Sequence, residues 1–187
     1  MDELPILYVG PRPPAALREL GPELDLVIRT AATAAEARQE LAVRPCALAV
    51  LDLPLPDEFG TELAEDLSES SLTQVLLLSP AEPYPLLAQR GVERGVPVLP
   101  KPADPELLRQ AVGLLLSAGR RLAAMERRAV AAEQKAADLR FVGRAKLLLM
   151  EREHLSEAEA HRYLEKTAMD LGMKVRQVAI RVIHRYD

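Results

Sequence analysis

The stretch that decides the fold is residues 47–60, which read ALAVLDLPLPDEFG. Its first part, from Ala47 to Leu51, is continuously apolar, ends at Asp52 and is followed by two prolines. A short apolar run bounded by turn residues is typical of a strand that is buried on both faces. Asp52 therefore lies at the end of a strand, and the carboxyl edge of a parallel sheet is where binding sites collect.

On both sides of this stretch, short apolar runs alternate with helical patterns. Thr33, with Glu36 three residues later, predicts a capping box at the start of one helix. We expect strands at 4–9, 24–28, 47–51, 74–78 and 96–99, and helices at 15–20, 33–43, 61–69 and 85–93. Apolar strands separated by helices belong to a parallel sheet covered on both faces. The predicted fold class is therefore α/β, with a doubly wound, five-stranded parallel sheet.

A long helix follows the sheet. Asp104 is its predicted N-cap, Pro105 is its first residue, and no proline interrupts it up to about Glu153. Its apolar positions alternate at spacings of three and four: Leu108, Ala111, Leu115, Ala118, Leu122, Met125, Ala129, Ala132, Ala136 and Leu139. This spacing predicts a left-handed coiled coil and a parallel homodimer through the linker helix. Alternatively, the first two turns of this helix only cover the sheet. The two interpretations are compatible, because the start of the helix can cover the sheet while its continuation pairs with a second copy.

Two shorter helices complete the chain. Ser156 with Glu159 predicts a capping box, and Gly172 suits a left-handed helix end. Phe141, Ala145, Leu148 and Leu149 on the long helix form the first apolar stripe. The other stripes are Ala160, Tyr163, Leu164, Thr167, Ala168 and Leu171, and then Val175, Val178, Ala179, Val182, Ile183 and Tyr186. The three stripes predict a small three-helix bundle, with both tyrosines in its core.

The net charge of the chain changes sign within the predicted long helix. Residues 1–119 hold 9 Lys and Arg against 18 Asp and Glu, whereas residues 120–187 hold 15 against 10. Basic residues on several helices can follow a phosphate backbone, which supplies most nucleic-acid affinity. The candidate contacts on the outer faces are Arg144, Lys146, Arg162, Lys166, Lys174, Arg176 and Arg181. Composition alone does not choose between RNA and DNA.

The remaining bulk features restrict the class of protein. The single cysteine, Cys46, forms no internal disulfide and is expected to be buried. Neither a secretory leader nor an apolar run of about 20 residues is present, so we expect a cytoplasmic protein without a membrane segment. No nucleophile–base pair, metal-ligand cluster or glycine-rich phosphate loop stands out. We therefore expect no enzyme activity and no cofactor.

Residues 3–118 resemble the receiver domains of response regulators. The resemblance rests on Asp52 to Gly60, on Ser79 and on Lys101-Pro102, which match the phosphoacceptor strand and loop, the switch hydroxyl and the lysine of that family. It implies a flavodoxin-like fold. Gly10-Pro11 stands where receivers carry the acidic pair that holds Mg²⁺. We therefore predict a degenerate receiver with an Asp52–Lys101 ion pair, and Mg²⁺ only if Asp52 is phosphorylated.

Residues 127–187 resemble the ANTAR domain, an RNA-binding antitermination module. The matching residues are Ala145-Lys146, Leu149-Met150, Ser156-Glu157, Glu159-Ala160, Leu164, Ala168-Met169 and Val178-Ala179. The resemblance implies binding to hairpin loops in leader transcripts, which prevents terminator formation. Three positions depart from the family pattern: Leu147 replaces a glycine, His161 an aromatic residue and Glu165 a basic residue.

The sequence thus predicts a receiver-like domain at 1–118, a linker helix at 104–140 and an ANTAR-like domain at 127–187. The leading interpretation is an RNA-binding transcription antiterminator controlled by a protein partner or by dimerisation. The family includes an aliphatic-amidase antiterminator that a sequestering, ligand-sensing protein controls, so a sensor or sequestering partner is one expectation here. The alternatives are a phosphorylation-dependent two-component response regulator and a DNA-binding regulator.

Overall fold

The N-terminal half is built on a parallel sheet of five strands. The computed structural model describes residues 4–23, 26–70 and 72–186. The strands are β1 (Leu4–Val9), β2 (Leu26–Ala31), β3 (Leu48–Asp52), β4 (Gln74–Ser79) and β5 (Val98–Pro100). They lie in the order β2-β1-β3-β4-β5, which confirms the predicted doubly wound sheet. The predicted second strand starts at residues 24 and 25, which lie outside the described residues.

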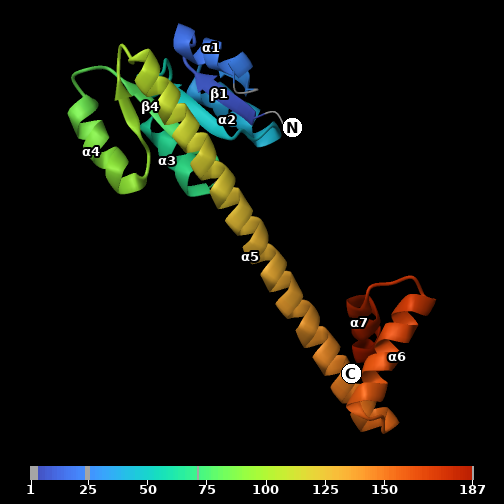
Figure 1. Ribbon diagram of the computed structural model, residues 1–187. Coiled ribbons are helices and arrows are strands. Elements are labelled where there is room, and N and C mark those ends of the chain that lie inside the picture. The colour runs from blue at the N-terminus through green and yellow to red at the C-terminus, as the bar shows by residue number, and fades with distance from the viewer. Residues whose placement is uncertain (1–3, 24–25, 71, 187) are drawn as a thin grey trace. The chain divides into compact units, whose positions relative to one another are not determined.

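Helices cover both faces of this sheet (Figure 1). They are α1 (Ala15–Glu23), α2 (Ala34–Val43), α3 (Thr61–Ser70), α4 (Tyr84–Arg94) and the start of α5 (Pro105–Glu153). Buried residues of α2, α3 and α4 share one hydrophobic cluster with one face of the sheet. Those of α1 and α5 share a second cluster with the other face. The alternation of side chains along each strand explains the split, because Leu7 and Val9 enter the first cluster and Ile6 and Tyr8 the second.

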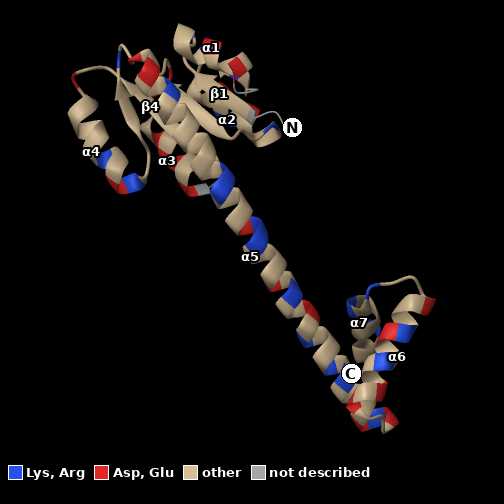
Figure 2. Cartoon of the chain, viewed as in Figure 1, with Lys and Arg blue, Asp and Glu red and all other residues tan. Residues whose placement is uncertain are grey.

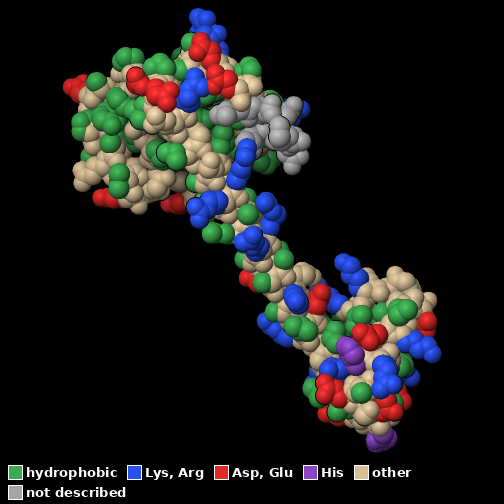
Figure 3. All heavy atoms as spheres, viewed as in Figure 1, with side chains coloured by type: hydrophobic (Ala, Val, Ile, Leu, Met, Phe, Trp, Pro, Cys, Tyr) green, Lys and Arg blue, Asp and Glu red, His purple; other side chains and the backbone are tan. Residues whose placement is uncertain are grey.

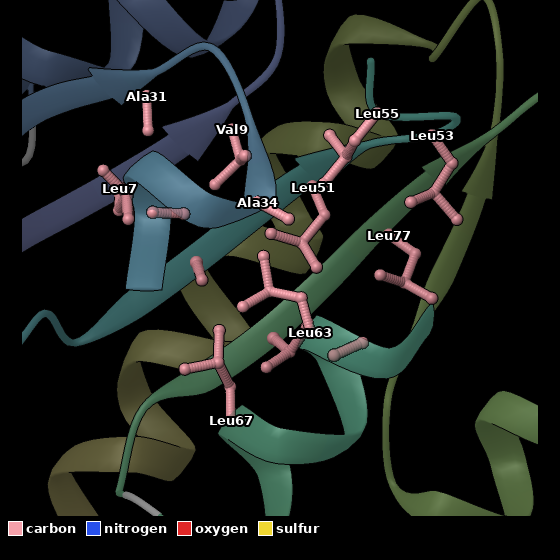
Figure 4. Packing of buried hydrophobic residues seen from close by; sticks show 14 of the residues in the cluster. Leu7, Val9, Ala31, Ala34, Leu51, Leu53, Leu55, Leu63, Leu67 and Leu77 are labelled. Atoms are coloured by element: carbon pink, nitrogen blue, oxygen red, sulfur yellow. The ribbon is translucent and has the colours of Figure 1, made fainter. Parts of the chain in front are cut away.

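The first cluster is made almost entirely of aliphatic side chains (Figure 4). Leu51 of β3 and Leu77 of β4 lie over Leu63 of α3, and all three are almost completely buried. Fully burying a leucine stabilises a fold by about 1.5–3 kcal/mol. Without tryptophan, the sheet is therefore held by many leucine, valine and alanine contacts rather than by a few large aromatic residues.

The long helix α5 begins as the sequence predicts, because the Asp104 carboxylate accepts a hydrogen bond from the Leu107 N–H at 2.9 Å. Leu108 and Leu115 are buried in the cluster that covers the sheet. Further along, Leu122, Met125 and Leu139 are about half exposed or more. By its contacts, the chain divides into two units, Met1–Ala124 and Met125–Asp187, and α5 belongs to both. None of the helices within the described ranges combines the length and apolarity that a membrane span requires.

The second unit contains the end of α5 together with α6 (Glu157–Asp170) and α7 (Val175–Tyr186). Its core joins all three helices, as predicted: Ala145, Leu149, Ala160, Leu164, Ala168, Val178, Ala179 and Val182 are buried together. Phe141 and Tyr163 are expected in this core but are 36% and 40% exposed, so that expectation is wrong. Leu171 is also exposed, because it lies beyond the last turn of α6.

Both ends of α6 have the predicted caps. The Ser156 hydroxyl accepts from the Glu159 N–H, and the Glu159 carboxylate accepts from the Ser156 N–H at 2.9 Å. At the other end, Gly172 has a φ of 61°, and the Met173 N–H donates to the Ala168 carbonyl at 2.9 Å. This is the Schellman arrangement, in which a glycine takes the left-handed conformation. The turn between α6 and α7 is therefore fixed by its own hydrogen bonds.

Candidate functional site

Asp52 lies at the end of β3, and Lys101 follows β5. The Lys101 Nζ donates to the Asp52 Oδ1 at 2.6 Å and to the Leu53 carbonyl at 2.5 Å. The two side chains are 15% and 34% exposed, so water screens this ion pair only partly. The structure thus brings together two of the three receiver-like residues, in the ion pair that the sequence predicts.

Tyr8 contacts the second oxygen of the same carboxylate, and the sequence pattern did not predict this contact. Its hydroxyl donates to the Asp52 Oδ2 at 2.6 Å, and its ring is fully buried. Burial raises the pKa of the Tyr8 phenol, and the hydrogen bond to Asp52 and the charge of that carboxylate raise it further. The phenol therefore stays protonated and remains a donor to Asp52. Both carboxylate oxygens of Asp52 are engaged by the protein itself.

The edge of the sheet beside Asp52 does not fit a magnesium ion. Mg²⁺ needs a nearly octahedral set of oxygen ligands, usually including carboxylates. Gly10 and Pro11 supply no carboxylate, and a Cβ placed on Gly10 would lie 2.7 Å from the Asp52 Cβ. Gly10 also has a φ of 150°, which an acidic residue rarely adopts. Within the described residues, no group of three or more His, Cys, Asp or Glu could hold a metal.

The acidic residues of the loop after β3 bind other groups of the protein. Asp57 accepts from the Ala34 and Ala35 N–H groups at the start of α2, at 2.9 and 3.0 Å. The bond from Ala35, followed by the bond from Ala34, lowers the pKa of Asp57. Glu58 binds Arg38 at 2.8 Å and accepts from the Leu63 N–H. These contacts shape the loop, and they leave neither carboxylate to complete a metal site.

Ser79, which carries the switch-like hydroxyl, and Thr33, the predicted cap of α2, also lie near this edge of the sheet. Ser79 is fully buried at the end of β4, and its hydroxyl donates to the Pro80 carbonyl at 2.9 Å. Thr33 caps α2 as predicted by accepting from the Glu36 N–H at 3.1 Å. The Glu36 carboxylate, however, accepts from the Ala32 N–H, one residue before the cap. Asp57 and Glu36 together satisfy amide groups at this helix start.

The candidate nucleic-acid contacts lie in the second unit, along whose helices Lys and Arg residues recur (Figure 2). Lys and Arg side chains are visible on the face of this unit that Figure 3 shows. Arg162 and Lys166 are exposed and lie one turn apart on α6. Lys174 is exposed just before α7, and Arg181 is exposed on that helix. For these four cations, no ion pair is found within the residues that the structure describes. They are therefore available to an anionic partner.

Two other candidate contacts are engaged inside the bundle. Lys146 binds Glu157 at 2.6 Å and so ties α5 to α6. Arg176 binds Asp138 at 3.1 Å and lies over the Phe141 ring, 5.2 Å from its centroid. Both side chains therefore hold helices together whatever else they contact. The seventh candidate, Arg144, is exposed on α5.

Of the three positions that depart from the ANTAR pattern, the structure shows contacts for His161 and Glu165 but does not explain Leu147. His161 and Glu165, one turn apart on α6, lie 3.3 Å apart. Glu165 therefore faces an imidazole of its own helix. Leu147 is 53% exposed, and nothing in the structure explains its choice over glycine. Tyr186 packs against the core as predicted, and its hydroxyl donates to Glu153.

The capping box gives the bundle a pH dependence. Hydrogen bonds from the Ser156 hydroxyl and N–H lower the pKa of Glu159. A carboxyl group whose pKa is lower in the folded than in the unfolded protein stabilises the fold at pH values above its unfolded pKa, which is about 4.3 for Glu. This stabilisation is lost as the pH falls through the lowered, folded-state pKa. We expect the melting temperature to fall below about pH 4 and to fall less in Glu159→Gln, which keeps the cap without a charge. Circular-dichroism melts at decreasing pH measure this, and equal declines would contradict it.

Comparison with known proteins agrees with both halves. Residues 123–183 match the ANTAR domain family. The receiver domain of an HD domain-containing protein from Pseudomonas fluorescens Pf-5 superposes with a TM-score of 0.54 and 25% identity, over 65% of this chain and 93% of that one. A CheY-like receiver domain protein from Methanospirillum hungatei gives 0.51 and 22%, over 64% and 98%. The predicted receiver-like fold and ANTAR resemblance are confirmed.

The chain is therefore a receiver-like domain joined to an ANTAR domain, the architecture of an ANTAR response regulator. It is also similar along most of its length to the transcriptional regulatory protein PdtaR of Mycobacterium tuberculosis. The two are 23% identical over 163 residues, which cover 87% of this chain and 78% of that protein.

Proposed function

We propose that this protein is an RNA-binding transcription antitermination regulator whose receiver-like half works without phosphorylation. The observation that carries the proposal is the ANTAR bundle itself, with four cations on its surface that no carboxylate of the described residues pairs. Neutralising phosphates with such side chains releases counterions and supplies affinity for RNA. In a leader transcript, bound protein would hold a hairpin that competes with the terminator.

Arg162 and Lys166 form the centre of the proposed contact surface. They lie at i and i+4 on α6, so their side chains share one face of the helix. The buried stripe at Ala160, Leu164 and Ala168 fixes the rotation of α6 against the other helices. The same stripe therefore directs this basic face away from the core and toward solvent.

Dimerisation through α5 is the second part of the proposal. Leu122, Met125 and Leu139 keep the three-four spacing and are 48%, 56% and 65% exposed. We call the apolar residues with this spacing the seam of α5. The earlier seam residues Leu108 and Leu115 are already buried against the sheet. The exposed part of the seam therefore begins where α5 no longer packs on the sheet. Two copies paired along it would present two bundles, which could bind two hairpins of one transcript.

The surroundings of Asp52 support the proposal that the receiver-like half works without phosphorylation. Phosphoryl transfer to a carboxylate needs an oxygen that can attack the phosphorus atom and a cation that offsets the growing charge. Tyr8 and Lys101 hold the two oxygens, and Gly10 and Pro11 provide no metal ligands. We therefore propose that a protein partner or dimerisation controls the protein.

Acetyl phosphate with Mg²⁺ should leave the mass of the intact protein unchanged. Each oxygen of the Asp52 carboxylate already accepts a hydrogen bond from the protein, and Gly10 and Pro11 beside it supply no carboxylate for a metal. Intact-mass spectrometry measures this, with a receiver that carries the acidic pair as the positive control. A single added phosphoryl group that disappears in Asp52→Asn would show that the receiver-like half is chemically active.

The proposed function is tested directly by recovering the target. Ultraviolet crosslinking in cells, followed by purification of the protein and sequencing of the attached transcripts, should enrich 5′ leaders that contain paired hairpins ahead of a terminator. Arg162→Glu combined with Lys166→Glu serves as the matched control and should lose this enrichment. Recovery of the same transcripts by both proteins would show that the α6 face does not bind them.

A further inference from the structure

The exposed ring of Phe141 lies in an open hollow of the second unit that the proposed phosphate contacts leave unused. The hollow is lined by Ala137, Arg140, Phe141 and Arg144 of α5 and by Ile183 of α7. Its volume of about 510 Å³ lies within the range of small-molecule sites. Its floor is apolar, and two guanidinium groups belong to its lining.

We propose that this hollow takes an unpaired base from the loop of an RNA hairpin, with the base stacked on Phe141. The inference rests on the proposed RNA-binding function and adds the place where a base is held. Single-stranded bases are recognised by stacking on aromatic rings and arginine planes, and phosphate contacts alone give no such selection. Phe141 is one of only two phenylalanines in the chain, and the other, Phe59, lies in the first unit.

The ring is held ready for stacking by its neighbours. Arg176 lies over Phe141, 5.2 Å from the ring centroid, and Asp138 holds Arg176 at 3.1 Å. Arg176 does not line the hollow, so its guanidinium leaves the hollow side of the ring uncovered. A base on the open side would extend a stack that already contains an arginine and a ring.

The charge of the hollow matches a nucleotide rather than a neutral apolar side chain. Arg140 precedes Phe141, Arg144 follows it by one turn, and both line the hollow, so they place positive charge beside a stacked base. The carboxylate beside the ring, Asp138, is paired with Arg176. The hollow therefore offers an aromatic surface with positive charge around it.

The proposed dimer leaves the hollow open. Each residue turns a helix by about 100°, so Phe141 points about 160° away from the seam residue Leu139. Ala137 and Arg144 also lie off the seam, since the seam positions in this region are Ala136, Leu139 and Gly143. A second copy of α5 would pair on the far side of the helix from the ring.

The test uses the full chain and a pool of RNA hairpins with a fixed paired stem and a randomised loop. The same stem as a blunt RNA duplex is the comparison. We expect the wild type to prefer looped RNA, and Phe141→Leu to lose about tenfold of affinity for the enriched loops with no change for the duplex. Phe141→Tyr, which keeps a ring, should retain the preference. Because the side chain is partly exposed, both variants should keep wild-type helicity and melting behaviour.

Each other outcome has a definite meaning. If Phe141→Leu binds the looped pool as the wild type does, the base site is wrong, and the proposed function stands. If the wild type does not prefer looped RNA over the duplex, the proposed function itself fails. If an oligoglutamate peptide binds the wild type as tightly as the looped pool and loses affinity in Phe141→Leu, the hollow takes an acidic peptide, and the inference is overturned.

Discussion

Arg162→Glu combined with Lys166→Glu will weaken the binding of looped RNA by at least about tenfold at low salt. Both side chains are exposed on one face of α6, and neither forms an ion pair within the described part of the chain. Replacement removes two cations from the proposed phosphate contact and places two anions there. The slope of log affinity against log salt should also become shallower by about one for each phosphate that is no longer neutralised. Fluorescence anisotropy over a series of salt concentrations measures both quantities.

The matched control for this pair is Arg12→Glu with Arg18→Glu. Those two arginines are exposed in the first unit, so the control changes net charge equally and leaves the bundle intact. It should retain most of the affinity and the full salt slope. If both double variants weaken binding to the same extent, overall charge rather than the α6 face governs affinity.

The structure also shows which variants to avoid in this experiment. Charge reversal of Lys146 would place two carboxylates together, because Glu157 lies 2.6 Å from its Nζ. Reversal of Arg176 would do the same with Asp138 and would remove the cation from Phe141. Either change would disturb the packing of helices, so weaker RNA binding in such a variant would not identify a direct phosphate contact.

Leu122→Asp combined with Leu139→Asp will convert the proposed dimer to a monomer at micromolar concentration. In a parallel dimer these leucines lie on the seam, and burying a leucine contributes about 1.5–3 kcal/mol. A carboxylate at the same position would forgo that contribution and face its own copy across the axis. Light scattering coupled to size-exclusion chromatography reports the mass directly.

Val130→Asp is the matched control for the seam. Val130 is 58% exposed on the same helix, next to the seam residue Ala129 but turned about 100° from it. This variant should remain a dimer, and all three proteins should keep the same helicity. A wild-type protein that is monomeric at these concentrations would contradict the dimer, whereas dissociation of Val130→Asp would place the interface on another face of α5.

Most of the fold could be predicted because each element has a local signature. The run from Ala47 to Leu51 could only be a buried strand between a turn and two prolines, and β3 is found at Leu48–Asp52. Ser156 with Glu159 fixed the start of α6 to the residue. The helix predicted at 15–20 continues to Glu23, because Leu20 and Gly21 are buried against the sheet and support another turn.

Periodicity could not separate the two environments of α5. Leu108 and Leu122 belong to one apolar repeat, yet the first is fully buried against the sheet and the second is 48% exposed. A heptad pattern records which positions are apolar, but not whether the covering surface comes from the same chain. Only the packed structure shows where one covering surface ends.

The candidate site was predicted in part. The Asp52–Lys101 pair followed from the two strand ends, since parallel strands bring their carboxyl ends to one edge. Tyr8 was missed, although a buried tyrosine needs a partner for its hydroxyl and Asp52 closes the adjacent strand. Phe141 was assigned to the core because its spacing fits the apolar stripe. That spacing does not show that the ring is partly exposed, with Arg176 over it.

We expect the purified protein to bind hairpin RNA without a phosphodonor. The most direct measurement is a competition in which unlabelled RNA hairpins and unlabelled DNA duplexes of equal length displace a labelled RNA hairpin at matched, low salt. The hairpins should displace the labelled RNA at much lower concentration than the duplexes do, and adding acetyl phosphate and Mg²⁺ should change nothing. Equal displacement by the DNA duplexes, or binding that appears only with the phosphodonor, would contradict it.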